Sequence, residues 1–578
     1  MSNIRLPQDY EKKVRKSKYN LGTREVTTLL PGMIIPIYSR KMMPGDRFHF
    51  DVNALIKSIP LQSPLYSTFK LQTAIFFDSD SNYYGWMDNN RKMSTSEYLS
   101  RRRHTITPEF EKLRMESGEN GYVLDKDDAN DIFTTGIFNN FRGSILDYMN
   151  IESGLLVPYD QDDDSEPLID PYEFDAGFVL TYLNIFRNYY ASKQEDEYPF
   201  LGARSHSRTH NTVQIYTGSK MSMLDELFMK IRMEKDGINL KDIKFSTGSG
   251  MNQDDLNWQA YLFSLSTPNG GILLSTFLPD YYRNLLSSVV GSVASKVTST
   301  GNQFTIDSLR FANKLQRFID RVDVSGGRWS DALRTVWGVK TRKDMDIPEL
   351  MGVSQSLIDP SQVTATAQTG EPGGDNSTDL GQFGGNFDVF CHGRRHSFTA
   401  STPGRVMVCV TLVPQVDYCQ GISVEASQIE FADDFAPEFD QLGFQPVPLK
   451  RYTAGLEFYM DSENENILWK ANKGPSTVIG KQIAWLDLMT DVNHCHGEFA
   501  NNGVYRSWVL QRNWMRQTGA VGSSDFAVKY DITHYINPLD FQYPFLYQNL
   551  DDMNWFLQID FAIDAVRPKG KRFMPNLE

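Results

Sequence analysis

Apolar and polar positions alternate in segments near both ends of the chain. In the segment 555–566, one face would carry Trp555, Leu557, Ile559, Phe561, Ile563 and Ala565. The other face is mostly polar, which is typical of a strand that buries mainly one side. Near the start, 32–37 leads through a Pro-Gly-Asp turn into a second such segment, and 67–77 forms a third. This pattern predicts that the first and last segments pair within one β-sandwich.

Helical spacing appears between these groups of strands. The segment 178–192 repeats apolar residues at helical steps, from Leu180 through Leu183 and Phe186 to Tyr190. The segment 304–338 predicts two helices, because apolar residues recur at three- and four-residue steps before a glycine pair that can end a helix. Ser330 then offers an N-cap hydroxyl for the second of them. We therefore expect several helices inside a mainly β chain.

Two stretches between the strands lack a clear period. Residues 195–270 are weakly patterned and polar, which indicates a surface elaboration within helical and loop insertions over about 85–340. Residues 344–385 end in a part rich in Gly, Ser, Thr and Asp, which we interpret as an irregular loop. Strands resume in the apolar run 405–413. Large insertions between the strands of one sandwich account for this order.

The composition supports a large packed core. Of 578 residues, 40% are hydrophobic and 12% aromatic, while 22% are charged, so disorder is not the default. The most apolar runs fall far below the roughly 20 residues that cross a bilayer, and the N-terminus holds no secretory signal. We expect a soluble protein with no membrane partner. Its four irregularly placed cysteines favour a thiol-reducing compartment over a disulfide scaffold.

Charge is distributed unevenly along the chain, whose net charge is −14. The N-terminal arm, 1–24, holds seven cations against two carboxylates, a net of +5, and the C-terminal tail, 565–578, holds four against one, a net of +3. The residues between them therefore carry −22. Basic ends on an acidic body indicate that the two face different surroundings, although basic tails can also serve solubility alone.

The basic ends also suggest a kind of ligand. Lysine and arginine neutralise phosphates, and the nearby rings of Tyr10 and Tyr19 can stack on unpaired bases. The candidate DNA-binding residues are Lys12, Lys13, Arg15, Lys16, Lys18, Arg567, Lys569, Lys571 and Arg572.

Histidine and cysteine residues form one candidate metal site. His494, Cys495 and His496 are followed by Glu498, which is similar to the His-x-His and Glu of the cupin oxygenases, themselves jelly rolls. The glutamate comes too soon after His496, however, and no second cupin segment is present. A further set, Cys391, His392 and His396, lacks the spacing of a standard zinc site. We therefore expect no bound metal.

Two charged runs suggest weaker alternatives. The acidic run 160–166 alternates carboxylates as a calcium loop does, but Ser165 and Pro171 stand where an EF-hand needs Gly and Glu. We interpret this run as a solvated loop. The run Arg101-Arg102-Arg103-His104 is a candidate for phosphate contact, and the preferred interpretation is a charged loop or a subunit contact.

No sequence motif points to catalysis. The chain contains no nucleophile elbow, phosphate-binding loop, dinucleotide fingerprint or HExxH pattern. We therefore expect no enzymatic activity and no cofactor.

Several segments resemble one family in the same order along the chain. The segment 304–338 is similar, in its FTIDSLR helix, SGG joint and Trp-bearing second helix, to the major capsid proteins of the Microviridae. The segments 63–90, 182–196, 270–286 and 566–577 resemble, respectively, the family's early strand, Tyr-rich helix, "PD" turn and closing Arg-Pro segment. The resemblance is closest to the gokushovirus and Bacteroidetes-type branch.

This resemblance implies a fold and a function. The fold would be a single eight-stranded antiparallel jelly roll of the viral capsid type, 25–578, with long inserted loops and several helices. Sixty copies would form a T=1 icosahedral shell around a circular single-stranded DNA genome, assembled in the host bacterial cytoplasm. Implied partners are other copies of the chain, the genome, a small basic DNA-binding protein, a pilot protein and a host surface receptor. For residues 195–270 the resemblance implies contact with the host or a protrusion at a symmetry axis.

Two other classes of protein stay open from the residues alone. One is a metal-dependent, cupin-like jelly-roll enzyme that uses His494 and His496. The other is a carbohydrate-binding or tail-fibre module, which would be a monomer or a trimer instead of a shell.

Overall fold

The computed structural model describes most of the chain in segments. These are 15–87, 100–108, 111–118, 121–123, 142–152, 156–160, 172–191, 197–203, 213–245, 253–276, 286–287, 314, 347–364, 383–430, 433–439, 444–453, 457–460, 467–469, 477–500, 503–512, 514–518, 527–530 and 535–570. The two helices expected over 304–338 lie outside the described residues, apart from Lys314.

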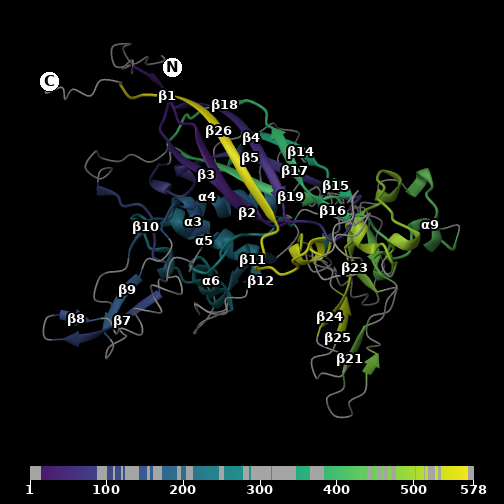
Figure 1. The fold of residues 1–578 in the computed structure, drawn as a ribbon. Helices are drawn as coiled ribbons and strands as arrows, with labels where there is room; N and C mark the ends of the chain where they lie inside the picture. Colours follow the sequence, from purple (N-terminus) through teal and green to yellow (C-terminus); the bar gives the residue numbers. More distant parts are fainter. Residues whose placement is uncertain are drawn as a thin grey trace, which may run out of the picture.

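Two antiparallel sheets pack face to face and form the main body (Figure 1). The first sheet has the order β2 (Thr23–Leu29), β26 (Trp555–Arg567), β4 (Arg47–Ser58), and then β17 (Asp388–His392) with β18 (His396–Thr399). A further strand, β1 (Ser17–Asn20), continues the position of β2 along β26. The second sheet has the order β14 (Glu349–Ile358), β5 (Phe69–Ser79), β19 (Gly404–Pro414) and β3 (Ile34–Met42).

The order of these strands along the chain is that of a jelly roll. From β2 to β5 successive strands alternate between the two sheets; β14 stays in the second sheet, and the alternation resumes with β17, β19 and β26. This is the double Greek-key connection of viral jelly rolls. The described strands therefore confirm the predicted mainly β, antiparallel, capsid-type jelly roll.

Strand β26 joins the two ends of the chain. It pairs with β4 over the whole length of that strand, from Trp555 opposite Ser58 to Val566 opposite Arg47. On its other side it pairs with β1 and β2. The alternating residues expected to face inward are all buried, so the predicted pairing of the first and last segments is confirmed.

The core between the sheets is rich in aromatic rings. The Trp555 ring lies 4.8 Å from the Phe69 ring and 4.6 Å from the Phe387 ring, centroid to centroid. Near the other end, the rings of Tyr38 and Phe561 lie 5.1 Å apart. Such ring pairs add specific geometry to apolar burial. Large side chains thus close the sandwich along the length of β26.

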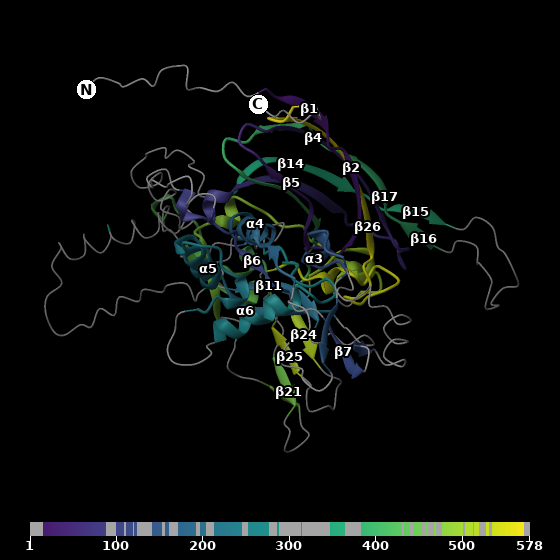
Figure 2. The ribbon, with the colours of Figure 1, turned by 90° about the vertical axis from the view of Figure 1, so that its left-hand side faces the viewer.

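The longest connection joins β5 to β14 and folds back under the second sheet (Figure 2). Its central helix, α4 (Gly177–Ile185), continues as a π-helical turn to Tyr190, which confirms the helix predicted over 178–192. Every residue of α4 after Gly177 is buried, as expected of a helix that is apolar on all sides. Tyr182 donates to the Ile34 carbonyl at 2.8 Å and accepts from the Leu273 amide at 2.9 Å. The insertion is thereby joined to the sandwich.

The described parts of 195–270 share this core. They form β11 (Glu197–Ala203), β12 (Val213–Lys220), α5 (Met221–Met233) and α6 (Gln253–Ser264). Tyr198, Phe200, Trp258 and Tyr261 are buried in the same apolar cluster as the sandwich. These parts are therefore not a detachable appendage, and only their outward side chains are available as surface.

The irregular loop expected over 344–385 needs a correction. Residues 349–358 form β14, which pairs with β5 at the edge of the second sheet. Further along, β15 (Ser361–Thr364) pairs with β16 (Phe383–Asn386). The strand was missed because β14 is mostly half-buried or exposed, with a register shift between Leu350 and Gly352, so its apolar alternation is weak.

A second long connection joins β19 to β26 and supplies strands to two small sheets. In one of them β23 (Val478–Ile483) pairs with β20 (Phe444–Pro448) and with β13 (Leu286–Ser287), which comes from the connection between β5 and β14. The other combines β22 (Ile467–Trp469), β21 (Phe458–Met460), β25 (Ala527–Tyr530) and β24 (Met515–Thr518). The remaining elements are β6 (Thr105–Ile106), β7 (Glu111–Gly118), β8 (Gly121–Val123), β9 (Leu156–Asp160), β10 (Phe174–Asp175), α3 (Ile145–Tyr148) and α9 (Val424–Ser427).

Two further expectations concern the described residues as a whole. None of the four cysteines is in a disulfide; three are buried and Cys419 is partly so, which is consistent with the interpretation that favours no disulfide scaffold. Within the described segments, no helix has the length and apolarity needed to cross a bilayer.

One carboxylate is fully buried where β5 ends. Asp78 accepts hydrogen bonds from the Tyr83 hydroxyl, from Asn82 Nδ2 at 2.7 Å and from Asn184 Nδ2 at 3.3 Å. Burial raises the pKa of Asp78 to about 7, although these hydrogen bonds oppose the rise. Asn184 belongs to α4, so these hydrogen bonds to Asp78 fasten the connection between β5 and β14, which we name the first insertion, to the sandwich.

The raised pKa of Asp78 predicts a pH-dependent stability. The folded state binds the Asp78 proton more tightly than the unfolded chain does, so this proton stabilises the folded state. That contribution to the free energy of unfolding is fully present below the ordinary carboxyl pKa of 3.8 and is lost as the pH rises through about 7. We expect Asp78→Asn, which cannot ionise, to reduce the fall in melting temperature between pH 5 and pH 8. Thermal unfolding of dissociated subunits followed by circular dichroism measures this, and parallel curves for the two proteins would contradict the expectation.

Candidate nucleic-acid interface

The fold brings the two basic ends of the chain together. In the pairing of β1 with β26, Ser17 lies opposite Arg567 and Asn20 opposite Asp564, and both termini leave the sandwich at the same end (Figure 1). The Tyr19 hydroxyl donates to the carbonyls of Lys569 at 2.9 Å and Gly570 at 3.1 Å. We name residues 15–20 and 564–570 the terminal ribbon. Of the sequence-predicted DNA-binding residues, the structure gathers five here: Arg15, Lys16, Lys18, Arg567 and Lys569.

Arg567 has a structural role within this ribbon. Its guanidinium donates to Asp46 Oδ2 at 3.0 Å and 2.9 Å and to the Lys41 carbonyl at 2.9 Å, and it lies over the Phe48 ring. Asp46 is fully buried, so its carboxylate depends on this cation. The geometry therefore favours a structural pairing for Arg567 over a phosphate contact. Sequence reasoning missed Asp46, because no local signal connects positions 521 residues apart.

Two other cations of the ribbon have partners that leave them exposed. Lys18 Nζ lies 2.8 Å from Asp564 Oδ2, with both side chains about half exposed. Lys16 Nζ donates to the Gly45 carbonyl at 2.7 Å. Exposed ion pairs contribute little to stability, so both lysines can turn to a phosphate at small cost.

The remaining candidates divide into two groups. Arg15 and Lys569 are exposed, and among the described residues neither has a carboxylate partner. Lys12, Lys13, Lys571 and Arg572 lie outside the described residues. The terminal ribbon thus presents Arg15, Lys16 and Lys569 to solvent at the base of both basic segments.

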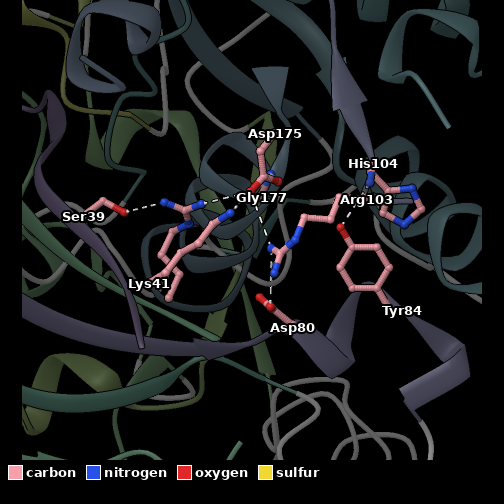
Figure 3. A network of polar contacts seen from close by, with 9 residues as sticks. Ser39, Lys41, Asp80, Tyr84, Arg103, His104, Asp175 and Gly177 are labelled. Atoms are coloured by element: carbon pink, nitrogen blue, oxygen red, sulfur yellow. Dashed lines mark hydrogen bonds and ion pairs between the residues drawn. The ribbon is translucent and has the colours of Figure 1, made fainter. Parts of the chain in front are cut away.

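The arginines at 101–103 each lie near a carboxylate, and Arg103 belongs to the network of polar contacts shown in Figure 3. Arg101 lies 3.0 Å from Asp236, Arg102 lies 3.5 Å from Glu173, and Arg103 lies 3.5 Å from Asp175. Each of the three arginines thus has a carboxylate partner. This agrees with the charged-loop interpretation, while Arg102 stays 75% exposed in its pair with Glu173.

Asp175 is the centre of that network. Lys41 from β3 donates to it, Arg405 from β19 lies 3.6 Å away, and the Gly177 amide donates to it at 3.0 Å. Burial raises the pKa of Asp175, but the hydrogen bonds from Lys41 and Gly177 outweigh burial and hold this pKa below its ordinary value. The network therefore ties the first insertion to the second sheet by charge, next to Asp80 and Arg103.

His104, the last residue of that run, is a core residue. Its ring stacks on the Tyr84 ring at 4.6 Å, and its Nε2 lies 3.2 Å from the Tyr83 carbonyl. Burial lowers the pKa of His104, so the ring stays neutral at physiological pH. A neutral, buried histidine has no role in phosphate binding.

The candidate metal ligands are not brought together. His494 and His496 are exposed, with ring centroids 5.9 Å apart, in the connection between β19 and β26. Cys391 and His392 lie in β17 and His396 in β18. Among the described residues, no group of three His, Cys, Asp or Glu side chains has metal-binding geometry. Most of the acidic run 160–166 lies outside the described residues.

A capsid-type jelly roll with basic segments at one end is typical of one class of protein, the structural proteins of virus shells. The comparisons with known proteins agree. The family model described as capsid protein (F protein) matches residues 180–516, which is more than half of the chain. Capsid protein VP1 of Chlamydia phage 1 is 22% identical over 551 residues, covering 87% of each chain.

The chain therefore belongs to the phage F capsid protein family and is a major capsid protein of the Microviridae. The predicted family is confirmed. Members of this family are structural proteins, not enzymes, and they assemble with copies of themselves into the capsid of the virion. The capsid protein therefore takes the place of the two alternatives, the cupin-like enzyme and the carbohydrate-binding or tail-fibre module.

The structural role of Arg567 predicts an effect on stability that the exposed Lys569 does not share. We expect Arg567→Ala to lower the free energy of unfolding by about 3 kcal/mol, because it leaves the Asp46 carboxylate buried without a cation. Lys569→Ala serves as the matched control and should change it by less than about 0.5 kcal/mol. Urea unfolding of dissociated subunits measures both. Equal effects of the two substitutions would show that Arg567 is not a structural residue.

Proposed function

We propose that sixty copies of this chain form a T=1 icosahedral shell around a circular single-stranded DNA genome, and that both basic ends contact this DNA. One observation carries the proposal: β1 and β26 pair so that the N-terminal and C-terminal cations leave the sandwich at one place. Because a shell has an inside and an outside, cations gathered on one edge can all face the genome. Assembly would take place in the cytoplasm of the host bacterium.

Charge gives this arrangement a physical purpose. The residues between the basic ends carry a net charge of −22, so an acidic body would repel the nucleic acid it encloses. Cations on the terminal ribbon and on the segments that extend from it replace counterions along the phosphates, without reading base sequence. The Tyr19 hydroxyl donates within the ribbon, and stacking on unpaired bases, which uses the ring face, is proposed for Tyr19 and for Tyr10, which lies outside the described residues.

The amount of charge implies further virion components. With +8 on each copy, sixty copies supply about 480 positive charges, whereas encoding 578 residues alone needs roughly 1,700 phosphates. We therefore propose that a small basic DNA-binding protein supplies most of the remaining charge. A pilot protein is a second proposed partner.

Host contact is assigned to the first insertion. The helices α5 and α6, within 195–270, lie on the side of the insertion away from the sandwich (Figure 2). Their burial pattern supports this division, since Leu224, Leu227 and Ile231 of α5 face the core while Met229 and Met233 are exposed. We propose that this outer side meets a surface receptor of the host.

The role of the basic arm predicts a loss of packaged DNA. We expect replacement of Lys12, Lys13, Arg15 and Lys16 by alanine to lower the DNA content of assembled particles, most strongly at low salt, because the contribution of phosphate contacts falls as the salt concentration rises. Lys18 stays in place because it pairs with Asp564. DNA extracted per particle from gradient-purified shells gives the measurement.

A control variant tests whether the loss of DNA depends on where the positive charges are removed or only on how many are removed. Alanine at four exposed lysines of the first insertion removes the same charge far from the ribbon; these are Lys220, Lys235, Lys241 and Lys244. Particles of this variant should keep their DNA. Unchanged DNA content in the arm variant, or an equal loss in both, would reject the proposed contact.

A further inference from the structure

Five side chains form an exposed apolar surface far from the terminal ribbon. Tyr66 comes from the connection between β4 and β5, and Phe499, Val504, Tyr505 and Trp508 come from the connection between β19 and β26. We name them the aromatic patch. The Tyr66 ring lies 5.8 Å from the Phe499 ring and 5.9 Å from the Trp508 ring, and Tyr505 lies 5.0 Å from Trp508. The four rings thus form one connected cluster.

The backbone holds this patch in place. The Tyr66 amide donates to the Trp508 carbonyl at 2.7 Å, and the Ser63 hydroxyl donates to the Ser507 carbonyl at 3.2 Å. Within the longer connection, the Tyr505 amide donates to the Glu498 carbonyl at 3.0 Å. A surface fixed in this way loses little conformational freedom when it binds a partner.

The patch is more exposed than large apolar side chains normally are. Val504 is 79% exposed, Tyr66 65% and Tyr505 43%, while Phe499 and Trp508 are half-buried beneath them. Because a buried aromatic ring covers about 150–250 Å², these three side chains present roughly 300 Å² of apolar area. A stable interface buries about 800 Å² on each partner around an aromatic core. The patch has the size and composition of such a core.

Its position argues against a role in DNA binding. The patch lies beside the end of β4 that pairs with Trp555, whereas the terminal ribbon lies at Arg567, the other end of β26. The 13 residues of β26 span roughly 40 Å at the rise of a β-strand. Next to the patch, the negative charge of Glu498 and the positive charge of Arg506 cancel, so these two residues give it no net positive charge for phosphates. Glu498 accepts from the Val504 amide at 3.2 Å, and Arg506 lies over the Tyr543 ring.

We propose that the aromatic patch is a contact between copies of this chain in the capsid, covered by a neighbouring subunit. This inference rests on the self-assembly of the family, which supplies a second copy as the partner always present in the shell. Aromatic rings fixed at the centre of a contact typically provide most of its binding energy. One charge placed there, with no countercharge opposite, opposes assembly in every subunit of the shell.

The first experiment compares the same substitution at two equally exposed valines. We expect Val504→Asp to raise the subunit concentration needed for assembly at least tenfold, in gradient sedimentation and electron microscopy, with the subunit melting temperature unchanged. The control is Val26→Asp, on the face of β2 that points away from the core, where Val26 is 70% exposed. Control particles should form as the unchanged protein's do.

Each other outcome overturns the inference. Val504→Asp particles that form normally but lack DNA would assign the patch to the genome, and particles with full DNA that fail to attach would assign it to the host. Equal loss of assembly in both variants would assign the effect to the added charge. Because the unchanged protein is tested beside them, failure of its own shell formation or DNA packaging would instead count against the proposed function.

A second measurement remains informative if aspartate at position 504 prevents folding. Val504→Cys keeps a small apolar side chain, and iodoacetamide labelling of residue 504 is followed by peptide-resolved mass spectrometry. We expect fast labelling in dissociated subunits and at least tenfold slower labelling in assembled particles. Equal rates in both states would overturn the proposal. Val26→Cys, labelled in parallel, reports whether the reagent reaches an exposed valine that is outside the patch.

Discussion

The pairing of β26 with β1, β2 and β4 is the interaction on which the rest of the structure depends. It closes the first sheet with the last strand of the chain, and its inward residues supply one wall of the core between the sheets. The same pairing places the N-terminal and C-terminal cations side by side. Backbone hydrogen bonds of one strand therefore determine both how the sandwich is completed and where its basic segments leave it.

Long insertions are compatible with this sandwich because they are anchored by buried polar groups. Asp78 and Asn184 connect β5 to α4, and Asp175 connects the insertion to β3 and β19 through Lys41 and Arg405. A buried carboxylate is costly unless it has partners, so such groups fix one arrangement of the insertion over its alternatives. Apolar side chains of α4, α5 and α6 are buried beside these polar groups. Assembly surfaces built on these insertions inherit a defined position.

Sequence patterns predicted the strands and helices whose apolar residues recur at a regular spacing and are buried in the fold. The alternation over 555–566 and the helical period over 178–192 were sufficient, because each has a long apolar face. Strand β14 was missed because an edge strand with few buried side chains has almost no alternation. In the candidate site, composition identified the basic ends, but not that Arg567 pairs with Asp46 or that Arg103 pairs with Asp175. Those pairings join distant positions, and no local pattern reports them.

The late position of β26 has a consequence for synthesis of the chain. At roughly 5–20 residues per second, a ribosome needs on the order of a minute to reach residue 555, and until then β2 and β4 have no strand between them. Unpaired strand edges invite pairing with other chains. A nascent subunit is therefore open at the centre of its first sheet until β26 has been synthesised. A product that ends before β26 lacks the strand that pairs with β1, β2 and β4, and its first sheet cannot close.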